Sequence, residues 1–276
     1  MKLLSPGLLL VIATALTGRV DPLVETPQDK AWRILRTGAG EKSQEVRVIA
    51  VGALGLVDHN PKAAAMAEKA LEDKRPEVRA AGARALGQML NAPSIPKLRK
   101  ALADKEDLVV TAAAQSLVLL KDPAGYEFYY SVLTGERKKR QGMITKEMEV
   151  LKDPKKVVTY SIEEGIGFFP YAGYGVTAVE FIKKEEQDEA SAKAVAAKFL
   201  ANDPDPQSSE ALARAVSDKS WRIRMAALEA IAKRADPSLL DKIQPAMSDE
   251  KSHVRYTAAA AVIKLTDVSA AKKSKK

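Results

Sequence analysis

Few side chains in this chain of 276 residues are suited to covalent or metal chemistry. The absence of cysteine excludes thiol catalysis, disulfides and a lipoprotein anchor. The two histidines, His59 and His253, lie far apart, and neither has a second histidine three or four residues away, as a helical zinc site requires. The sequence contains no nucleophile elbow, phosphate-binding loop or dinucleotide fingerprint. We therefore expect no catalytic residue, no metal site and no cofactor, and predict a protein that is not an enzyme.

Two pairs of adjacent glutamates, at 163–164 and 185–186, remain as candidates for acid–base chemistry. Neighbouring residues on a helix point about 100° apart, so the members of one pair diverge. Two carboxylates acting on one substrate would have to converge from separate helices, which a sequence does not reveal.

Aromatic residues gather in the middle of the chain, where ten of the fourteen lie between positions 126 and 181. Phe128, Tyr160 and Phe181 fit core positions. The segment GFFPYAGYG at 167–175 is different, because it is a glycine-rich turn between two expected helices. Aromatic side chains in such a turn are typical of a contact surface. The alternative is a loop folded back onto an extra helix. The four candidate contact residues are Phe168, Phe169, Tyr171 and Tyr174.

A basic run precedes this aromatic loop, within an insertion that breaks the spacing of the surrounding segments. It consists of Arg137, Lys138, Lys139 and Arg140. Such a run is either a solvated surface loop or a site for an anionic partner or anionic lipid head groups. Contact with a membrane surface therefore stays open.

The elements that would position these residues are repeated helix pairs. Segments opening with a Val-Arg or similar anchor recur with small apolar residues at helical spacing, as in VRAAGARALGQM from Val78. Shorter amphipathic segments return between them, and most follow a Pro, Ser, Asn or Asp. A period near 31 residues with two helices per unit predicts an α-solenoid. The anchors lie at 46, 78, 109, 158, 192, 223 and 254, and the return helices at 61–71, 94–102, 124–133, 176–184, 208–216 and 238–247.

The joints between units share an acidic residue followed six residues later by arginine. We expect a structural ladder, because an arginine fork can hold carboxylates or loop carbonyls of adjacent units; ligand binding is the alternative role. Units three and four have Val110 and Thr159 instead of the arginine. The pairs are Asp73 with Arg79, Asp218 with Arg224, and Asp249 with Arg255.

The joint pattern D-x-x-x-x-V-R-x-x-A-A-x-A-L-G resembles short HEAT repeats of the bilin-lyase-like (PBS-lyase) type, and the resemblance covers about residues 30–267. It implies an all-α fold, a HEAT/armadillo-like superhelix of about six and a half helix-pair repeats. The family includes scaffolds, adaptors and a few enzymes, so the fold does not name the function. Trp221, at a joint, is expected to pack between units.

The amino terminus has the three-part layout of a secretory signal. Lys2 precedes an apolar stretch, and Ala13-Thr14-Ala15 supplies the small residues of a cleavage site. The stretch is shorter than the roughly 20 apolar residues of a spanning helix. The alternative is an apolar helix that caps the solenoid. We predict cleavage and a periplasmic or secreted location for a bacterial protein.

These patterns divide the chain into six parts. Helix 29–37 looks like the second helix of a missing unit and is expected to cap repeat one, while unit seven keeps only its first helix. We expect a signal peptide at 1–15, a linker at 16–28, the cap helix with repeats one to three at 29–134, an insertion at 135–151, repeats four to seven at 152–267, and a basic disordered tail at 268–276.

The formal charge of +8 owes four units to lysines of the tail. Acidic residues interleave with basic ones in nearly every joint, so no basic stripe follows the repeats and no nucleic-acid partner is expected. We predict an exported, non-catalytic scaffold or adaptor that binds a protein or peptide through the solenoid surface and the aromatic loop. The alternatives are an accessory subunit of a bilin-lyase-like chromophore enzyme, or a nucleic-acid binder if the amino terminus is not cleaved.

Overall fold

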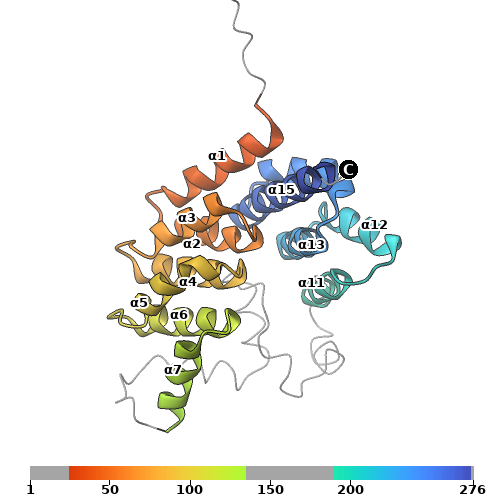
Figure 1. The fold of residues 1–276 in the computed structure, drawn as a ribbon. Helices are drawn as coiled ribbons and strands as arrows, with labels where there is room; N and C mark the ends of the chain where they lie inside the picture. Colours follow the sequence, from red (N-terminus) through yellow and green to blue (C-terminus); the bar gives the residue numbers. More distant parts are fainter. Residues whose placement is uncertain (1–24, 135–188, 275–276) are drawn as a thin grey trace, which may run out of the picture.

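The computed structural model describes residues 25–134 and 189–274, and within these ranges it contains helices and no strand. The expected all-α solenoid is confirmed (Figure 1). The helices are α1 (Pro27–Ala39), α2 (Gln44–Ala53), α3 (Pro61–Ala70), α4 (Pro76–Gln88), α5 (Ile95–Ala101), α6 (Asp107–Leu119), α7 (Pro123–Leu133), α11 (Glu189–Leu200), α12 (Pro206–Ala215), α13 (Trp221–Arg234), α14 (Leu240–Ile243) and α15 (Ser252–Lys273), with 3-10 turns η1 (Leu54–Leu56), η2 (Ala92–Ser94), η3 (Pro237–Leu239) and η4 (Gln244–Ser248).

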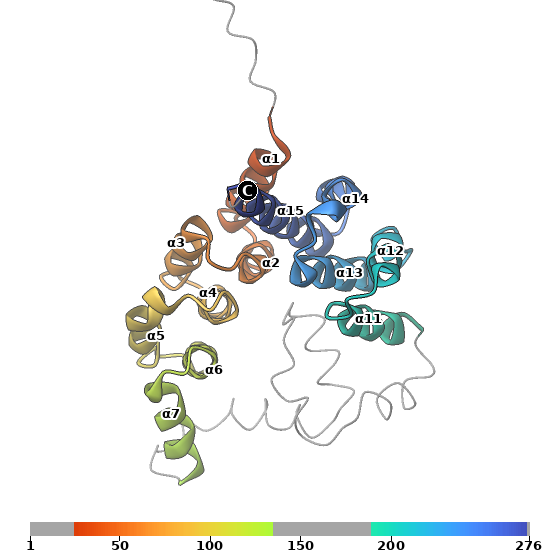
Figure 2. The same ribbon diagram turned by 45° about the vertical axis from the view of Figure 1, so that its right-hand side comes forward.

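The helices form an arch with two limbs, which Figure 2 shows most clearly. One limb runs from α2 to α7 and the other from α11 to α15. The first helix of each unit lies on the inside, so α2, α4 and α6 face α11, α13 and α15 across the arch. The return helices α3, α5, α7, α12 and α14 lie on the outside. Any contact between the limbs therefore involves the inner helices.

The outer helices begin where the sequence supplies a cap. Asn60 Oδ1 accepts hydrogen bonds from the backbone N–H groups of Lys62 and Ala63, and Asp205 caps α12 in the same way. Proline occupies the first helical position of α3, α7 and α12, where its missing N–H costs nothing. The return helices predicted at 61–71, 94–102, 124–133 and 208–216 are confirmed. The segment 238–247 folds as η3, α14 and η4, and 176–184 lies outside the described residues.

Small side chains allow the helices to pack closely. A Cβ added to Gly82 on α4 would lie 2.7 Å from the carbonyl oxygen of Ala67 on α3, so the backbones of these two helices meet directly at this point. Buried alanines fill most of the remaining space, and one apolar core extends from Trp32 through both limbs to Leu265. Each helix pair buries little by itself, so the stack depends on its neighbours.

At the top of the arch, the two ends of the chain together make one helix pair. The helix α15 lies beside α2 in the inner row, and α1 packs on α15 as its outer partner. Leu35 of α1 and Leu265 of α15 are fully buried. Asp267 accepts hydrogen bonds from Gln28 Nε2 at 2.8 Å and from Asn60 Nδ2 at 2.7 Å, which tie α15 to the amino-terminal limb. We call the pair of α15 and α1 the split repeat.

The split repeat corrects two expectations about the chain ends. The helix at 29–37 packs on α2 of repeat one as expected, but it does not end the stack, because it also packs on α15 and supplies the second helix that unit seven lacks. The disordered tail at 268–276 is wrong for 268–273, which continue α15. Lys272 and Lys273 lie in the last turn of that helix, where positive charge interacts favourably with the helix dipole.

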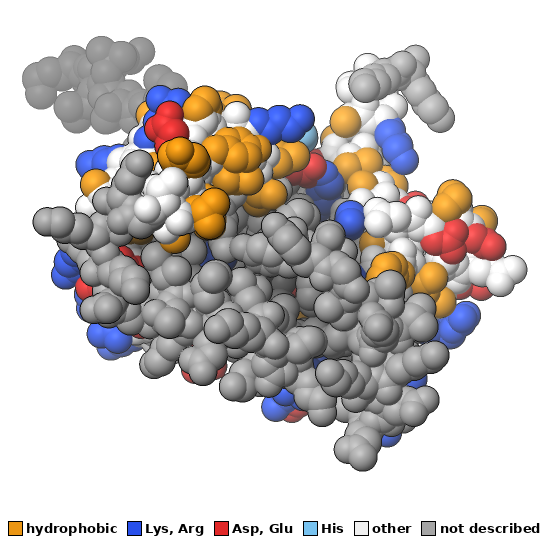
Figure 3. All heavy atoms as spheres, turned by 90° about the horizontal axis from the view of Figure 1, so that it is seen from below, with side chains coloured by type: hydrophobic (Ala, Val, Ile, Leu, Met, Phe, Trp, Pro, Cys, Tyr) orange, Lys and Arg blue, Asp and Glu red, His pale blue; other side chains and the backbone are white. Residues whose placement is uncertain are grey.

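The described part of the stack therefore ends at α7 and α11, which precede and follow residues 135–188 in the sequence. The predicted insertion at 135–151 and the predicted fourth unit lie outside the described residues, as do the signal peptide and most of the linker. Hydrophobic side chains reach the surface on both limbs near these ends (Figure 3). The large ones are Tyr126, Tyr130 and Leu133 on α7 and Phe199 on α11.

Candidate functional site

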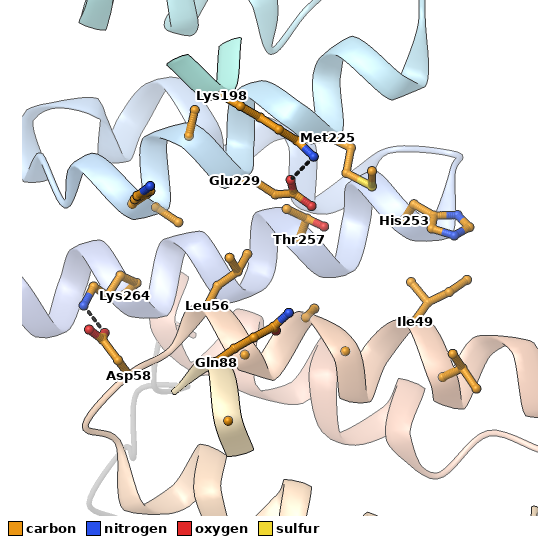
Figure 4. A pocket seen from close by; sticks show the side chains of 18 of the residues that line it. Ile49, Leu56, Asp58, Gln88, Lys198, Met225, Glu229, His253, Thr257 and Lys264 are labelled. Carbon is orange, nitrogen blue, oxygen red and sulfur yellow. Dashed lines mark hydrogen bonds and ion pairs between the residues drawn. The ribbon is translucent and has the colours of Figure 1, made fainter. Parts of the chain in front are cut away.

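The inner helices of the two limbs enclose a groove of about 630 Å³. Side chains of α2, η1, α4, α6, α11, α13 and α15 line it, so the groove draws on almost every described repeat. Its volume falls within the range of about 300–1,000 Å³ that is usual for ligand pockets. Figure 4 shows that the side chains of the two limbs point toward each other across this space.

The wall formed by α2 and η1 is mainly apolar. Val48, Ile49 and Leu56 line it. Gly52 lies between them, and a Cβ added there would meet no atom within 4 Å. This wall therefore has an open shelf over Gly52 where an apolar group of a ligand would fit.

The opposite wall carries a pair of charged side chains from neighbouring inner helices. Lys198 Nζ of α11 lies 3.9 Å from Glu229 Oε2 of α13, with both side chains largely buried. Glu229 Oε2 is buried and has no hydrogen-bond partner among the described residues. Burial raises the pKa of Glu229, and the charge of Lys198 opposes part of this rise. A buried acceptor without a donor costs about 1–3 kcal/mol, and Glu77 Oε2 of α4, which also lines the groove, is a second acceptor of this kind.

Two further contacts border the groove. Lys264 of α15 pairs with Asp58, which follows η1, and this ion pair joins the two limbs beneath the split repeat. His253 stacks on Trp221 with ring centroids 4.9 Å apart. Trp221 therefore packs against the next unit, as predicted. His59 is exposed.

The arginine ladder is present, but its carboxylates are shifted by one unit from the predicted pairing. Arg79 donates to both carboxylate oxygens of Asp104 in the following joint, at 2.8 Å each. Within its own joint, Arg79 Nη1 reaches the carbonyl oxygen of Asp73 at 3.0 Å. The carboxylate of Asp73 is held by Arg47 of the preceding unit. An arginine fork thus closes its own joint through carbonyls and joins the next one through a carboxylate.

The carboxyl-terminal limb repeats this geometry. Arg224 donates to both oxygens of Asp249 at 2.8 and 3.0 Å and to the carbonyl oxygen of Asp218 at 2.9 Å. Arg255 donates to the carbonyl oxygen of Asp249 and to Ser252 Oγ. The three predicted pairs are therefore present through the backbone carbonyl of the aspartate, one of the two kinds of group that the fork was expected to hold, because the six-residue spacing places the carbonyl, and not the carboxylate, beside the guanidinium. The six ladder residues bind each other and lie at the joints, outside the groove.

Burial raises the pKa of the ladder carboxylates, but hydrogen bonds outweigh this effect. For Asp104, the bonds from Arg79 and from the backbone N–H of Glu106 bring the pKa below its ordinary value of 3.8. Asp73 and Asp249 have lowered pKa values for the same reasons. The ladder therefore carries its full ion pairs at neutral pH.

The predicted partner-binding residues lie outside the described residues. This applies to both groups, so the structure places none of them in the groove. They are Phe168, Phe169, Tyr171, Tyr174, Arg137, Lys138, Lys139 and Arg140. Phe128, which was expected in the core, is buried against Val110 and Ala114.

The Lys198–Glu229 pair was not predicted, although both residues occupy the same position of the repeat. Both residues stand six positions after the first residue of their anchors, and in three described units, at Gly52, Lys198 and Glu229, this position lines the groove. Its residue type changes from unit to unit. In the described units the position holds Gly52, Arg84, Gln115, Lys198, Glu229 and Ala260.

The described parts of the chain contain no group of three His, Cys, Asp or Glu side chains placed to hold a metal ion. Among their helices, none has the length and apolar character needed to cross a membrane.

Solved structures match this chain at low identity. They include the complex of CpcE and CpcF of phycocyanin lyase from Nostoc sp. PCC7120, with 18% identity over 90% of this chain and 98% of that chain and a TM-score of 0.34. Human deoxyhypusine hydroxylase in complex with glycerol has 17% identity over 87% and 97%, with a TM-score of 0.33. An engineered protein has 15% identity over 86% and 97%, with a TM-score of 0.30. No curated protein matches the chain.

The family comparison covers both limbs. The sequence profile of HEAT repeats matches residues 32–118 and 179–264, which together make up more than half of the chain. The matched regions contain the anchored inner helices and the ladder joints of both limbs. The chain belongs to the HEAT-repeat family.

Proposed function

We propose that this protein is an exported, non-catalytic scaffold that binds an extended segment of a protein or peptide in the groove between its limbs. The observation that carries the proposal is the groove itself, where inner helices of both limbs enclose about 630 Å³ between an apolar wall and a polar wall. Helical repeat proteins offer long concave surfaces of this kind to their partners. A peptide presents apolar side chains and hydrogen-bonding groups together, which suits two such walls.

The chemistry of the groove supports binding rather than catalysis. Glu229 and Glu77 each have a buried carboxylate oxygen that accepts no hydrogen bond from the described residues, and their charged neighbours, Lys198 and Arg75, lie at 3.9 Å. Among the described lining residues, no serine or cysteine stands beside a base. A nucleophile and a base within hydrogen-bond reach would be needed for covalent catalysis.

A second contact surface is part of the proposal. Tyr126 and Tyr130 of α7 are 54% and 64% exposed at the end of one limb, and aromatic side chains are enriched in contact surfaces. The aromatic loop at 167–175 and the basic run at 137–140 follow α7 in the sequence. We propose that these segments add contacts to the same partner.

Export is supported by the sequence of residues 1–15, which has a lysine, an apolar stretch and small residues before the predicted cleavage site. We propose that the protein works in the periplasm or outside the cell. Its partner would then be a protein or peptide of that compartment.

The experiment that tests the function is selection of peptides from a random display library against the full-length protein. Selections are run with and without an excess of the soluble Gly52→Phe variant. This substitution places an aromatic ring on the apolar wall of the groove, starting from a Cβ position that meets no atom within 4 Å. We expect the selection to enrich peptides that bind the unchanged protein. An excess of the soluble variant should not prevent their capture, because the variant does not bind them. No enrichment, or full competition by the variant, would contradict binding in the groove.

A further inference from the structure

The Lys198–Glu229 pair leaves hydrogen-bonding capacity on both side chains. The two atoms are 3.9 Å apart, which is longer than a hydrogen bond. Lys198 has three N–H donors and no acceptor, whereas the ionised carboxylate of Glu229 has acceptors only. Glu229 Oε2 accepts no hydrogen bond from the described residues. Side by side, the pair thus presents a donor and an acceptor (Figure 4).

The two charges of the pair balance each other. Lys198 faces Glu229, and Asp58 pairs with Lys264 across the groove; the other charged lining residues are Glu45, Glu77 and Lys233. A ligand cation at Glu229 would face the ammonium of Lys198, and a ligand anion at Lys198 would face the carboxylate. An uncharged group avoids both repulsions.

An amide group satisfies this arrangement with its own two polar atoms. Its carbonyl oxygen accepts from the Lys198 ammonium, and its N–H donates to the Glu229 carboxylate. Both interactions are charge-assisted hydrogen bonds, which are stronger than neutral ones. The apolar shelf over Gly52, with Ile49 beside it, lies on the opposite wall and would receive a neighbouring aliphatic side chain.

We propose that the groove recognises an uncharged, extended peptide segment in which an amide group bridges Lys198 and Glu229 and an aliphatic side chain lies over Gly52. This inference rests on the proposed function, and it names the chemistry of the peptide. Specificity comes from rejecting charged peptide side chains at the pair. A positively charged side chain there would be repelled by Lys198, and a negatively charged one by Glu229.

The test uses the full-length protein and three fluorescein-labelled peptides, Ala-Leu-Gln-Leu-Ala-amide and the same peptide with Lys or Glu in place of Gln. Binding is followed by fluorescence anisotropy. We expect the Gln peptide to bind at least about tenfold more tightly than either charged peptide. Equal or tighter binding of a charged peptide would overturn the proposed chemistry.

Variants of the pair provide the second readout. Lys198→Met and Glu229→Leu are expected to weaken binding of the Gln peptide about tenfold, whereas Glu229→Gln keeps an acceptor and retains most of the affinity. A thermal melt of each variant checks that it is folded, because Glu229→Leu removes a buried, unsatisfied acceptor but leaves the ammonium of Lys198 without its counter-charge. Arg84→Met is the matched control, because Arg84 has the same repeat position outside the groove lining.

Two results separate this inference from the proposed function. If Gly52→Phe abolishes binding of the Gln peptide while Lys198→Met and Glu229→Leu bind it normally, the groove binds peptides but the amide bridge is wrong. If Gly52→Phe binds the peptide as tightly as the unchanged protein, the groove is not the binding site and both proposals fail.

Discussion

Gly38 of α1 lies directly against the ring of Tyr256 of α15, at the centre of the split repeat. A Cβ added to Gly38 would lie 2.6 Å from Tyr256 Cζ and 2.7 Å from Ala50 Cβ of α2. Tyr256 is 5% exposed, so its ring cannot move into solvent without opening the contact. The absence of a side chain at position 38 therefore allows the two ends of the chain to close into one helix pair.

Gly38→Ala is expected to destabilise the protein by about 1–3 kcal/mol, because overpacking forces α1 away from α15. A thermal melt followed by circular dichroism would show a lower Tm. Gly40→Ala is the matched control, since the nearest atom to a Cβ there is Arg36 O at 3.5 Å. Equal Tm values for Gly38→Ala and the unchanged protein would show that the contact is not tight.

Arg79→Met is expected to cost about 2–4 kcal/mol, because it leaves the largely buried carboxylate of Asp104 without its fork. Urea denaturation measures this change. The double variant Arg79→Met with Asp104→Leu should lose less than the sum of the two single variants, since no charge is left unpaired. Breaking the exposed pair of Arg214 and Glu210 should have no measurable effect. Additive losses would argue against the ladder as a coupled unit.

Acid should unfold the protein partly through the ladder. The pKa of Asp104 is lower in the folded state than its ordinary value of 3.8. The ionised carboxylate therefore stabilises the folded protein at neutral pH, and this contribution is lost as pH falls from about 3.8 through the lower folded pKa. Urea denaturation at a series of pH values should show stability falling below about pH 4–5. Asp104→Asn should be less stable at pH 7 and should flatten this fall. An unchanged pH slope in that variant would contradict the lowered pKa.

Glu229 should have the opposite effect on the pH dependence of stability. Its pKa is raised in the folded state, so the protonated form favours folding and stability falls as pH rises from about 4.5 through the higher folded value. Replacement by Gln should therefore stabilise the protein more at pH 7 than at pH 4. The same measurement in urea at the two pH values checks this, and an equal effect at both would exclude a raised pKa.

Export predicts a shortened protein. Expressed in a bacterial host, the protein should be found outside the cytoplasm with an intact mass lacking residues 1–15. Mass spectrometry of cell fractions makes this measurement. A full-length mass in the cytoplasm would contradict export and would favour an apolar capping helix, with nucleic-acid binding again the main alternative.

The repeat period predicted most of the fold, because the anchored inner helices and their capped partners are local features of the sequence. The split repeat was not predictable in the same way. The half unit at each end was visible around Trp32 and Val254, but periodicity does not say that two halves more than 200 residues apart pack together. The ladder residues were found, while their register was missed, because each carboxylate binds an arginine of the preceding unit.

The groove depends on neighbouring helices, so single segments gave no sign of it. Lys198 and Glu229 are 31 residues apart, one repeat period, and only the stacking of α11 on α13 brings them together. Comparing one repeat position across all units would have singled them out. The predicted contact residues at 137–140 and 167–175 were chosen on composition and remain a prediction.

The central claim is that the groove holds the partner, and the most direct measurement is the dissociation constant of an enriched peptide for two matched variants. Gly52→Phe puts an aromatic ring on the apolar wall of the groove, whereas Gly40→Phe places the same side chain at the exposed end of α1. We predict that Gly52→Phe weakens binding at least about tenfold with an unchanged Tm, and that Gly40→Phe binds like the unchanged protein. Equal dissociation constants for both variants would show that the peptide binds elsewhere and would contradict the account.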